Sequence, residues 1–481
     1  MSGYRLLPFR FLRFDAARTL IVNDVGEFHF LATDDLTRFV QHELAAESDL
    51  YLDLKAKHFL FDSDSLAPFE LLAAKYRTKK AFLDGFTSLH IFVVSLRCEH
   101  SCHYCQVSRV SADKKRYDMS EETAERALDL AFRSPARRLK LELQGGEPLL
   151  HFERVRQIVR EGRRRADAGG RDVEFVVTTN LALLDSEMLA FFREHGVFLS
   201  TSLDGPRALH DANRPRPGND SHARTIDGIR RAREVLGHDR VAALMTTTSA
   251  SLQTPEAIVD EYVRLGFTSM FLRPLSPYGF ALRSVRTTGY SMREFLAFYV
   301  RALDYIIQRN AAGTFLIESY AQLLLTRILT PFATGYVDLQ SPAGAGIGAV
   351  VYNHDGDVYP TDESRMLAAM GDTRFRLGNV HRDSYEAIFG GDALRRIIAA
   401  SVAESIPGCA DCAFVPWCGA DPVHHYATNG DLVPHVPTSD FHEKNFFLIK
   451  HLLSLLERDD VTRRVLWSWI REEPLPREEV A

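Results

Sequence analysis

Hydrophobic and polar positions follow two different patterns, and the change falls near residue 85. Before it, apolar runs around "DVGE" predict a β-hairpin, "TDDLTRFVQHEL" predicts a helix capped by Thr33 or Asp34, and a second helix is expected over Leu66–Tyr76. After it, short apolar runs alternate with helical periodicity, which is typical of strand–helix–strand units. The expected strands are Leu89–Ser95, Leu139–Leu143, Val173–Thr179, Val197–Leu203, Val241–Thr247 and Ser269–Arg273. The helices expected between them are Glu121–Phe132, Glu153–Ala166, Ser186–His195, Thr225–Leu236 and Pro255–Leu265.

Six such units predict an α/β fold, a partial (β/α)6 barrel of the TIM type. Further helices are expected at Met292–Gln308, Phe315–Leu329 and Phe446–Trp469, and "HDG" between two apolar runs predicts a hairpin turn. We divide the chain into a small α+β domain (1–85), the barrel (86–325), a C-terminal domain (326–445) and a helical tail (446–481). Chemistry in such barrels gathers at the carboxyl ends of the strands, so residues that follow strands are the site candidates.

Charge and composition narrow the classes of function. Lys plus Arg number 58 and Asp plus Glu number 64, and the net charge of −6 argues against nonspecific nucleic-acid binding. No apolar run approaches the ~20 residues of a membrane span, and the arginine-containing N-terminus is unlike a signal peptide. We therefore expect a cytoplasmic protein with no nucleic-acid or membrane partner.

Six cysteines form two clusters in the sequence, Cys98, Cys102 and Cys105, and Cys409, Cys412 and Cys418. In a large chain without a secretion signal, clustered cysteines indicate metal ligands rather than disulfides. Structural zinc needs four ligands, and His100 or His103 would have to fold back to supply the fourth. A 4Fe-4S cluster is usually held by thiolates, and three on one short loop leave one iron open. The spacing of the first cluster favours this iron–sulfur site over zinc.

CxxxCxxC after the first strand resembles the radical S-adenosylmethionine (SAM) superfamily. Gly145-Gly146-Glu147-Pro148 after the second strand, "TTN" after the third and "SLDGPRALHDANR" after the fourth are similar to that family's other motifs. The resemblance implies a SAM site in which Tyr104 lies near the adenine and Asn180 meets the ribose. It also implies that Gly145, Gly146 and Glu147 hold the methionine amino group. Ser202 and Arg214 would bind the ribose and carboxylate.

The resemblance also implies the chemistry. Cys98, Cys102 and Cys105 would hold a 4Fe-4S cluster whose open iron binds SAM. Reduction would split SAM into methionine and a 5′-deoxyadenosyl radical that abstracts a substrate hydrogen. A reductant such as ferredoxin or flavodoxin is therefore an expected partner.

"CADCAFVPWC" at the second cysteine cluster resembles the SPASM or twitch auxiliary-cluster region of peptide-modifying members. That region has seven cysteines and two further 4Fe-4S clusters, whereas here "SPAGAG", Thr361 and Pro422 stand where cysteines are expected. We therefore expect no first auxiliary cluster. Cys409, Cys412 and Cys418 match three ligands of the second, either an iron–sulfur cluster or a Cys3His zinc site. The candidates for the fourth ligand are Asp440 and His442, then His424, His425 and His435.

Asp362 follows Thr361, where sulfatase-maturing relatives carry an aspartate that acts as a base. The resemblance implies a catalytic role for Asp362. The alternative is an ordinary turn carboxylate beside Glu363.

Several longer segments, among them "SPARRLKLELQGGEPLLHFE" and "FLRPLSPYGFA", resemble the His-Xaa-Ser system radical SAM maturase, B-type. This implies a ribosomally made precursor peptide with His-Xaa-Ser repeats as substrate, a second radical SAM enzyme as partner, and crosslinking, epimerisation or oxidation as the outcome. The N-terminal unit is similar in order to leader-recognition domains, which pair an edge strand with the leader; it could instead simply cover the barrel. A maturase of a folded protein such as a sulfatase, and a zinc-dependent binding scaffold, are the alternative functions.

Overall fold

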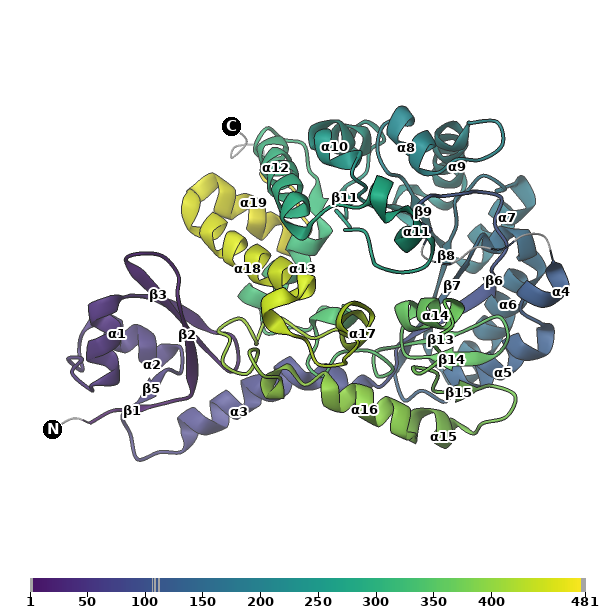
Figure 1. Cartoon of the computed structure of the whole chain (residues 1–481). Coiled ribbons are helices and arrows are strands. Elements are labelled where there is room, and N and C mark those ends of the chain that lie inside the picture. Colours follow the sequence, from purple (N-terminus) through teal and green to yellow (C-terminus); the bar gives the residue numbers. More distant parts are fainter. Residues whose placement is uncertain (1–2, 106, 108–109, 111–112, 477–481) are drawn as a thin grey trace.

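The computed structural model describes residues 3–105, 107, 110 and 113–476. Figure 1 shows the N-terminal unit at one end of the molecule, the β/α region at the other, and C-terminal segments between them. One hydrophobic core runs through the β/α region into the C-terminal helices, and a second, smaller core fills the N-terminal unit. The last five residues of the predicted tail lie outside the described residues.

The main sheet has the strand order β10-β9-β8-β7-β6-β13-β14-β15 among the described residues. Its parallel strands are β6 (Leu89–Ser95), β7 (Arg138–Gly145), β8 (Asp172–Thr178), β9 (Phe198–Ser202), β10 (Val241–Leu244) and β13 (Ala349–Tyr352). The antiparallel strands β14 (Asp357–Tyr359) and β15 (Gly378–Asn379) extend it. Five of the six predicted barrel strands are therefore confirmed, and so is the hairpin turn, which joins β13 to β14.

The crossover helices are α5 (Glu121–Ala131), α6 (Phe152–Gly169), α7 (Ser186–His195), α9 (Ser221–Leu236) and α10 (Pro255–Arg264), close to their predicted bounds. In α5, Ala124, Ala127, Leu128 and Ala131 are fully buried. Their helical spacing forms the apolar stripe that packs on the sheet. Together the strands and helices confirm the predicted α/β partial barrel.

The sixth predicted strand, Ser269–Arg273, does not continue the main sheet. Only β11 (Ser269–Met270) forms, and it pairs with β12 (Ile317–Glu318) in a separate two-stranded sheet. The backbone N–H of Leu272 donates to the Glu318 carboxylate at 3.0 Å, so a side chain replaces the next ladder bond. The predicted helix Phe315–Leu329 is correspondingly β12 followed by α13 (Ser319–Leu329).

The N-terminal unit contains a three-stranded antiparallel sheet, β2 (Phe9–Arg13), β3 (Arg18–Asn23) and β4 (Phe28–Ala32). The predicted hairpin is β3–β4, whereas β2 was not expected. The remaining elements are β1 (Arg5–Leu6) paired with β5 (Leu60–Phe61), and helices α1 (Thr33–Val40), α2 (Asp49–Ala56) and α3 (Ala67–Lys80). The predicted cap of the first helix is wrong: β4 runs directly into α1, and its N-cap, Ala32, has no capping side chain.

The other helices are α4 (Lys114–Tyr117), α8 (Arg207–Asn213), α11 (Phe280–Thr288), α12 (Met292–Ala311), α14 (Asp362–Ala369), α15 (Tyr385–Gly390), α16 (Asp392–Ala400), α17 (Pro422–Asn429), α18 (Asp440–Arg458) and α19 (Asp460–Arg471). The predicted tail helix is two helices, because Asp459 leaves helical geometry and its carboxylate caps α19 by accepting from the Thr462 N–H. Among the described residues, none of the helices has the length and apolar character required to cross a bilayer. The division into four domains stays a prediction, and β13 ties the third segment to the barrel sheet.

Candidate active site

The first cysteine cluster lies on the loop that leaves the carboxyl end of β6. Cys98, Cys102 and Cys105 are each half-buried and reduced. One bond fixes the loop to a neighbouring segment, since the Ser101 N–H donates to the Pro215 carbonyl at 2.8 Å, and one closes a turn within it, since the Cys105 N–H donates to the Cys102 carbonyl at 3.2 Å. The structure thus places the three thiols on one short loop at the strand end, where the barrel fold positions reactive groups.

The electrostatics of this loop fit a thiolate-bound metal cluster. Burial raises the pKa of the Cys98 thiol, and the negative charges of Glu99, Glu147 and Cys102 raise it further. Burial also raises the pKa of Cys102 to about 12, although Arg214 opposes the shift. Three free thiolates would repel one another here, whereas bound iron supplies the missing positive charge. The donor set therefore fits a 4Fe-4S cluster.

A fourth protein ligand from the neighbouring histidines is not supported. Within the described part of the chain, one group of His, Cys, Asp and Glu is compact enough to share an ion, Cys98, Glu99 and His100, with ligand atoms within 4.8 Å of one another. However, His100 uses Nε2 toward the Ser221 hydroxyl at 2.9 Å and Nδ1 toward Glu99 at 3.1 Å. His103 is exposed. The geometry favours three thiolates and an open position over tetrahedral zinc.

The two predicted glycines, Gly145 and Gly146, allow the backbone at the end of β7 to lie directly against the start of the cysteine loop. The Gly146 N–H donates to the Ser95 carbonyl and the Glu147 N–H donates to the Arg97 carbonyl, both at 2.7 Å. A Cβ on Gly146 would lie 2.3 Å from the Arg97 carbonyl oxygen, and Gly145 has a φ of +148° that favours glycine. These glycines hold the backbone that leads to Cys98.

Glu147 is completely buried and already has three donors. Its carboxylate accepts from the Thr179 hydroxyl at 2.6 Å, the Asn180 N–H at 2.9 Å and the Leu149 N–H at 3.1 Å. Burial, and then the charge of Glu99, raises its pKa to about 8. Glu147 therefore positions the turn at Asn180, and its contact with a methionine amino group stays a prediction.

Asn180 connects this turn to the cysteine loop. Its side-chain amide donates to Glu99 at 2.8 Å, and its carbonyl oxygen accepts from the Ala182 N–H at 2.9 Å. Sequence analysis did not identify Glu99, although its place between two cysteine ligands was a usable signal. The third strand end and the cysteine loop thus form one hydrogen-bonded wall.

Tyr104 and Arg214 meet at a residue that sequence analysis missed, Asp204. The Tyr104 hydroxyl donates to the Asp204 carboxylate at 2.5 Å, and Arg214 Nε donates to the same oxygen at 3.1 Å. Burial is the largest single influence and opposes ionisation of Asp204, but the Arg214 charge, the His210 ring and the hydrogen bonds from Tyr104 and Arg214 together lower its pKa. The "SLDG" sequence contains Asp204 directly after the fourth strand, which was the available signal. Ser202, also predicted, is half-buried at the end of β9.

We expect Asp204→Asn to destabilise the fold by about 3 kcal/mol, because the Arg214 charge loses its buried partner. Urea unfolding followed by circular dichroism measures the effect. Asp239→Asn is the matched control, since the Asp239 side chain is fully exposed, and it should change stability by less than about 0.5 kcal/mol. Equal effects of the two variants would contradict a structural role for Asp204.

The second cysteine cluster lines a small cavity together with His442. The cavity is bounded by Cys409, Cys412, Cys418, His442, Phe446 and apolar neighbours. Burial raises the pKa of Cys409 to about 11 and that of Cys418 to about 12, and each pKa is raised further by the neighbouring thiols. Burial lowers the pKa of His442, which favours the neutral imidazole that binds metals.

The other candidate ligands lie elsewhere. Asp440 and His424 line a separate, larger cavity. His425 packs edge-on against the Phe441 ring, and the His435 ring lies 2.9 Å from the Thr438 hydroxyl. Of the predicted fourth ligands, the structure brings only His442 to the wall of the three-cysteine cavity.

Two positions at which the SPASM or twitch region has cysteines, Thr361 and Pro422, lie at the starts of helices in this structure. Thr361 caps α14 by accepting from the Ser364 N–H at 3.1 Å, and Pro422 is the first residue of α17. Asp362 opens α14 and pairs with Arg365 at 2.8 Å, a position typical of a helix-stabilising carboxylate. Its predicted role as a base stays a prediction, and its neighbour Glu363 lines the larger cavity instead.

Comparison with known proteins agrees with this geometry. Residues 92–261 match the radical SAM superfamily model. An uncharacterized protein of Methanothermobacter thermautotrophicus is 30% identical over 194 residues, 40% of this chain and 69% of that protein. The serine-type anaerobic sulfatase-maturating enzyme of Bacteroides thetaiotaomicron is 28% identical over 143 residues, 28% of this chain and 33% of the enzyme.

Two solved structures share the fold over most of the chain. Native anSMEcpe with bound AdoMet and Cp18Cys peptide superposes with a TM-score of 0.63 at 18% identity, covering 80% of this chain and 99% of that one. Streptococcus suis SuiB bound to precursor peptide SuiA superposes with a TM-score of 0.53 at 15% identity, covering 90% of this chain and 98% of that one.

A partial β/α barrel with three thiols at the end of its first strand defines an iron–sulfur enzyme of the barrel class. The order of the motifs at its strand ends and the match to a family model specify the superfamily within this class. The chain belongs to the radical SAM superfamily, whose members use a 4Fe-4S cluster and SAM.

Proposed function

We propose that this enzyme is a maturase that modifies a ribosomally synthesised peptide, with a His-Xaa-Ser repeat precursor as the expected substrate. The observation that carries the proposal is the loop of Cys98, Cys102 and Cys105 at the carboxyl end of β6, beside which both His100 ring nitrogens are already engaged, with Glu99 and Ser221. The structural neighbours support the substrate class, since one is bound to a precursor peptide and another to a Cp18Cys peptide.

In this proposal the bound cluster and SAM supply a 5′-deoxyadenosyl radical for hydrogen abstraction. The chain's own residues would position SAM. Asn180, oriented by Glu147 and Glu99, would meet the ribose, and Arg214, oriented by Asp204, would meet the carboxylate or ribose with Ser202. Tyr104, whose ring lies 5.3 Å from the Arg214 guanidinium carbon, would cover the adenine.

The N-terminal unit offers an edge for the peptide leader. β2 lies at the edge of the three-stranded sheet, and Phe11 on it is 63% exposed. An added strand would satisfy the free backbone groups of β2, and Phe11 would provide an apolar contact. A second radical SAM enzyme, a reductant such as ferredoxin or flavodoxin, and a cytoplasmic location stay predictions.

The second cysteine cluster is proposed to hold an auxiliary metal centre with His442 as fourth ligand, an iron–sulfur cluster or zinc. His442→Ala should lower the affinity for this metal by at least about tenfold while the Cys98 site keeps its iron. Metal analysis after mild chelation measures the loss. His435→Ala is the control, because this ring lies outside the cavity; an equal loss in both variants would exclude His442 as a ligand.

A folded-protein substrate is the second candidate, and the similarity to a sulfatase-maturating enzyme favours it. Co-expression with each candidate substrate, followed by mass spectrometry, separates the two. A loss of about two mass units from the peptide indicates crosslinking or oxidation, and an unchanged mass in ordinary water with deuterium uptake in heavy water indicates epimerisation. A modified sulfatase serine or cysteine with an unchanged peptide would reject the peptide proposal.

A further inference from the structure

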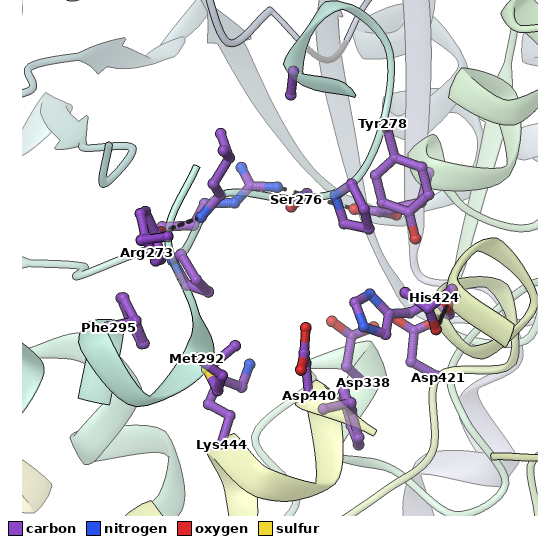
Figure 2. Close-up of a pocket in the computed structure, with 18 of the residues that line it drawn as sticks. Arg273, Ser276, Tyr278, Met292, Phe295, Asp338, Asp421, His424, Asp440 and Lys444 are labelled. Atoms are coloured by element: carbon purple, nitrogen blue, oxygen red, sulfur yellow. Dashed lines mark hydrogen bonds and ion pairs between the residues drawn. The ribbon is translucent and has the colours of Figure 1, made fainter. Parts of the chain in front are cut away.

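A second cavity of about 270 Å³ lies between the barrel and the C-terminal segments. Its walls come from the chain after β11, from α11 and α12, and from α14, α17 and α18. Figure 2 shows Tyr278 and Arg273 across an open space from Asp338, Asp421 and Lys444. The proposed SAM chemistry does not use these groups.

Three carboxyl groups dominate the polar part of this cavity, and we call Asp338, Glu363 and Asp421 the acidic trio. Each comes from a different segment of the C-terminal region. Arg273 and Lys444 line the same cavity, and Arg273 lies 4.0 Å from Glu363. Two positive charges against three carboxylates leave the ionised trio one negative charge in excess, and exposed Asp440 adds another.

Unsatisfied polar atoms independently indicate an occupant. Tyr278 is 1% exposed, and its hydroxyl has no hydrogen-bond partner among the described residues. Figure 2 shows this hydroxyl pointing toward His424 and Asp421. His424 Nε2 is likewise buried without a partner in the described part of the chain. Buried polar atoms are almost always bonded, so these two groups are suited to a ligand that enters the cavity.

The remaining wall is aromatic and apolar, with Phe271, Tyr320 and Tyr336 in mutual ring contact. Aromatic faces beside carboxylates are a favourable environment for an organic cation.

We propose that this cavity binds a positively charged nitrogen group of the substrate peptide, an ammonium, guanidinium or imidazolium, with the acidic trio as counter-charges. The inference rests on the proposed peptide maturase function and specifies its substrate. The cation would pair with the trio, and the Tyr278 hydroxyl and His424 Nε2 would bond the adjacent peptide backbone.

The pKa values of the acidic trio are consistent with a site for a cation. Burial first, and then mutual repulsion, raises the pKa of Asp338, Glu363 and Asp421 to about 7 each. The other charged or titratable groups around them are Arg273, Lys444, Asp362, Asp440, His424, Tyr278, Tyr290, Tyr299, Tyr320 and Tyr336. Burial lowers the pKa of His424 to about 3, so it stays neutral near pH 7. Cation affinity should therefore rise from about pH 6 to about pH 8, as the trio ionises.

The test uses the full-length reconstituted enzyme and four probes, the N-acetyl methylamides of lysine, arginine, histidine and neutral norleucine. Ligand-observed NMR titration measures binding without SAM. We expect the lysine or arginine probe to bind about tenfold more tightly than norleucine at pH 7.5. The histidine probe, whose ordinary pKa is about 6.5, is mostly neutral at this pH and is compared with norleucine at pH 6.5 instead. Equal or tighter binding of norleucine would overturn the proposal.

Two variants with opposite expected effects guard against misfolding. Replacing the trio (Asp338→Asn, Glu363→Gln, Asp421→Asn) should remove the preference for the cation, while Lys444→Gln should strengthen cation binding several-fold, which a folding defect cannot do. Asp239→Asn is the surface control and should bind like the native enzyme. A cation preference that survives replacement of the trio would refute the site. SAM cleavage without peptide, measured separately, reports the failure of the radical chemistry itself.

Discussion

Cys98→Ala is expected to reduce formation of 5′-deoxyadenosine from SAM by at least about 10³-fold. Cys98 supplies one of three thiolates on the loop after β6, and the neighbouring Glu99 and His100 side chains are engaged with Asn180 and Ser221. Two remaining thiolates hold the cluster poorly, so about four irons per chain should be lost. Chromatographic quantitation of 5′-deoxyadenosine under reduction, together with iron analysis, measures both effects.

Cys409→Ala is the matched control for this prediction. It removes an equivalent thiol from the second cysteine cluster, so it should lower the auxiliary metal content and leave SAM cleavage without peptide within a few-fold of the native rate. Retention of SAM cleavage by Cys98→Ala would exclude the loop as the site of the chemistry. A zinc content with no iron in the native protein would do the same.

Gly146→Ala should destabilise the protein by about 3 kcal/mol and also reduce cluster incorporation. The added methyl carbon would lie 2.3 Å from the Arg97 carbonyl oxygen, and 2.7 Å from that of Leu96, so the backbone before Cys98 must move. Both neighbours are backbone atoms that cannot rotate away. Urea unfolding of the apoprotein gives the stability change, and iron per chain after reconstitution gives the effect on the site.

Gly390→Ala provides the comparison, since a Cβ added to Gly390 at the end of α15 would have nothing within 4 Å. It should alter stability by less than about 0.5 kcal/mol and leave iron content unchanged. A Gly146→Ala protein as stable as the Gly390→Ala protein would show that β7 and the loop can separate without cost.

Local patterns predicted what is local in the structure. Continuous apolar runs located β6 to β10, and cysteine spacing located both metal-binding candidates, because each signal spans a few residues. The position of β13 beside β6 was not predicted, since it joins Val350 to His90, which are far apart along the chain. Likewise, no spacing rule could choose His442 over Asp440, because they are two residues apart and face different cavities.

The network residues Glu99 and Asp204 were missed for another reason. Their partners, Asn180, Tyr104 and Arg214, were predicted as direct contacts to SAM, and sequence patterns do not show which groups orient a contact residue. Glu363 was missed in a similar way. The family resemblance pointed to Asp362, but Asp362 pairs with Arg365, and it is the next residue, Glu363, that lines the larger cavity.

The N-terminal three-stranded sheet also contacts the loop of the second cysteine cluster. Arg10 on β2 donates to the Ala410 carbonyl at 2.5 Å, between Cys409 and Cys412, and the Trp417 indole donates to the Gly26 carbonyl at 3.2 Å. The sheet proposed for leader docking and the loop proposed for the auxiliary metal are therefore hydrogen-bonded to each other, so a change in one alters the contacts of the other. Truncating the first 85 residues would uncover that metal loop as well as remove the edge, so single changes such as Phe11→Ser are the fair way to probe docking.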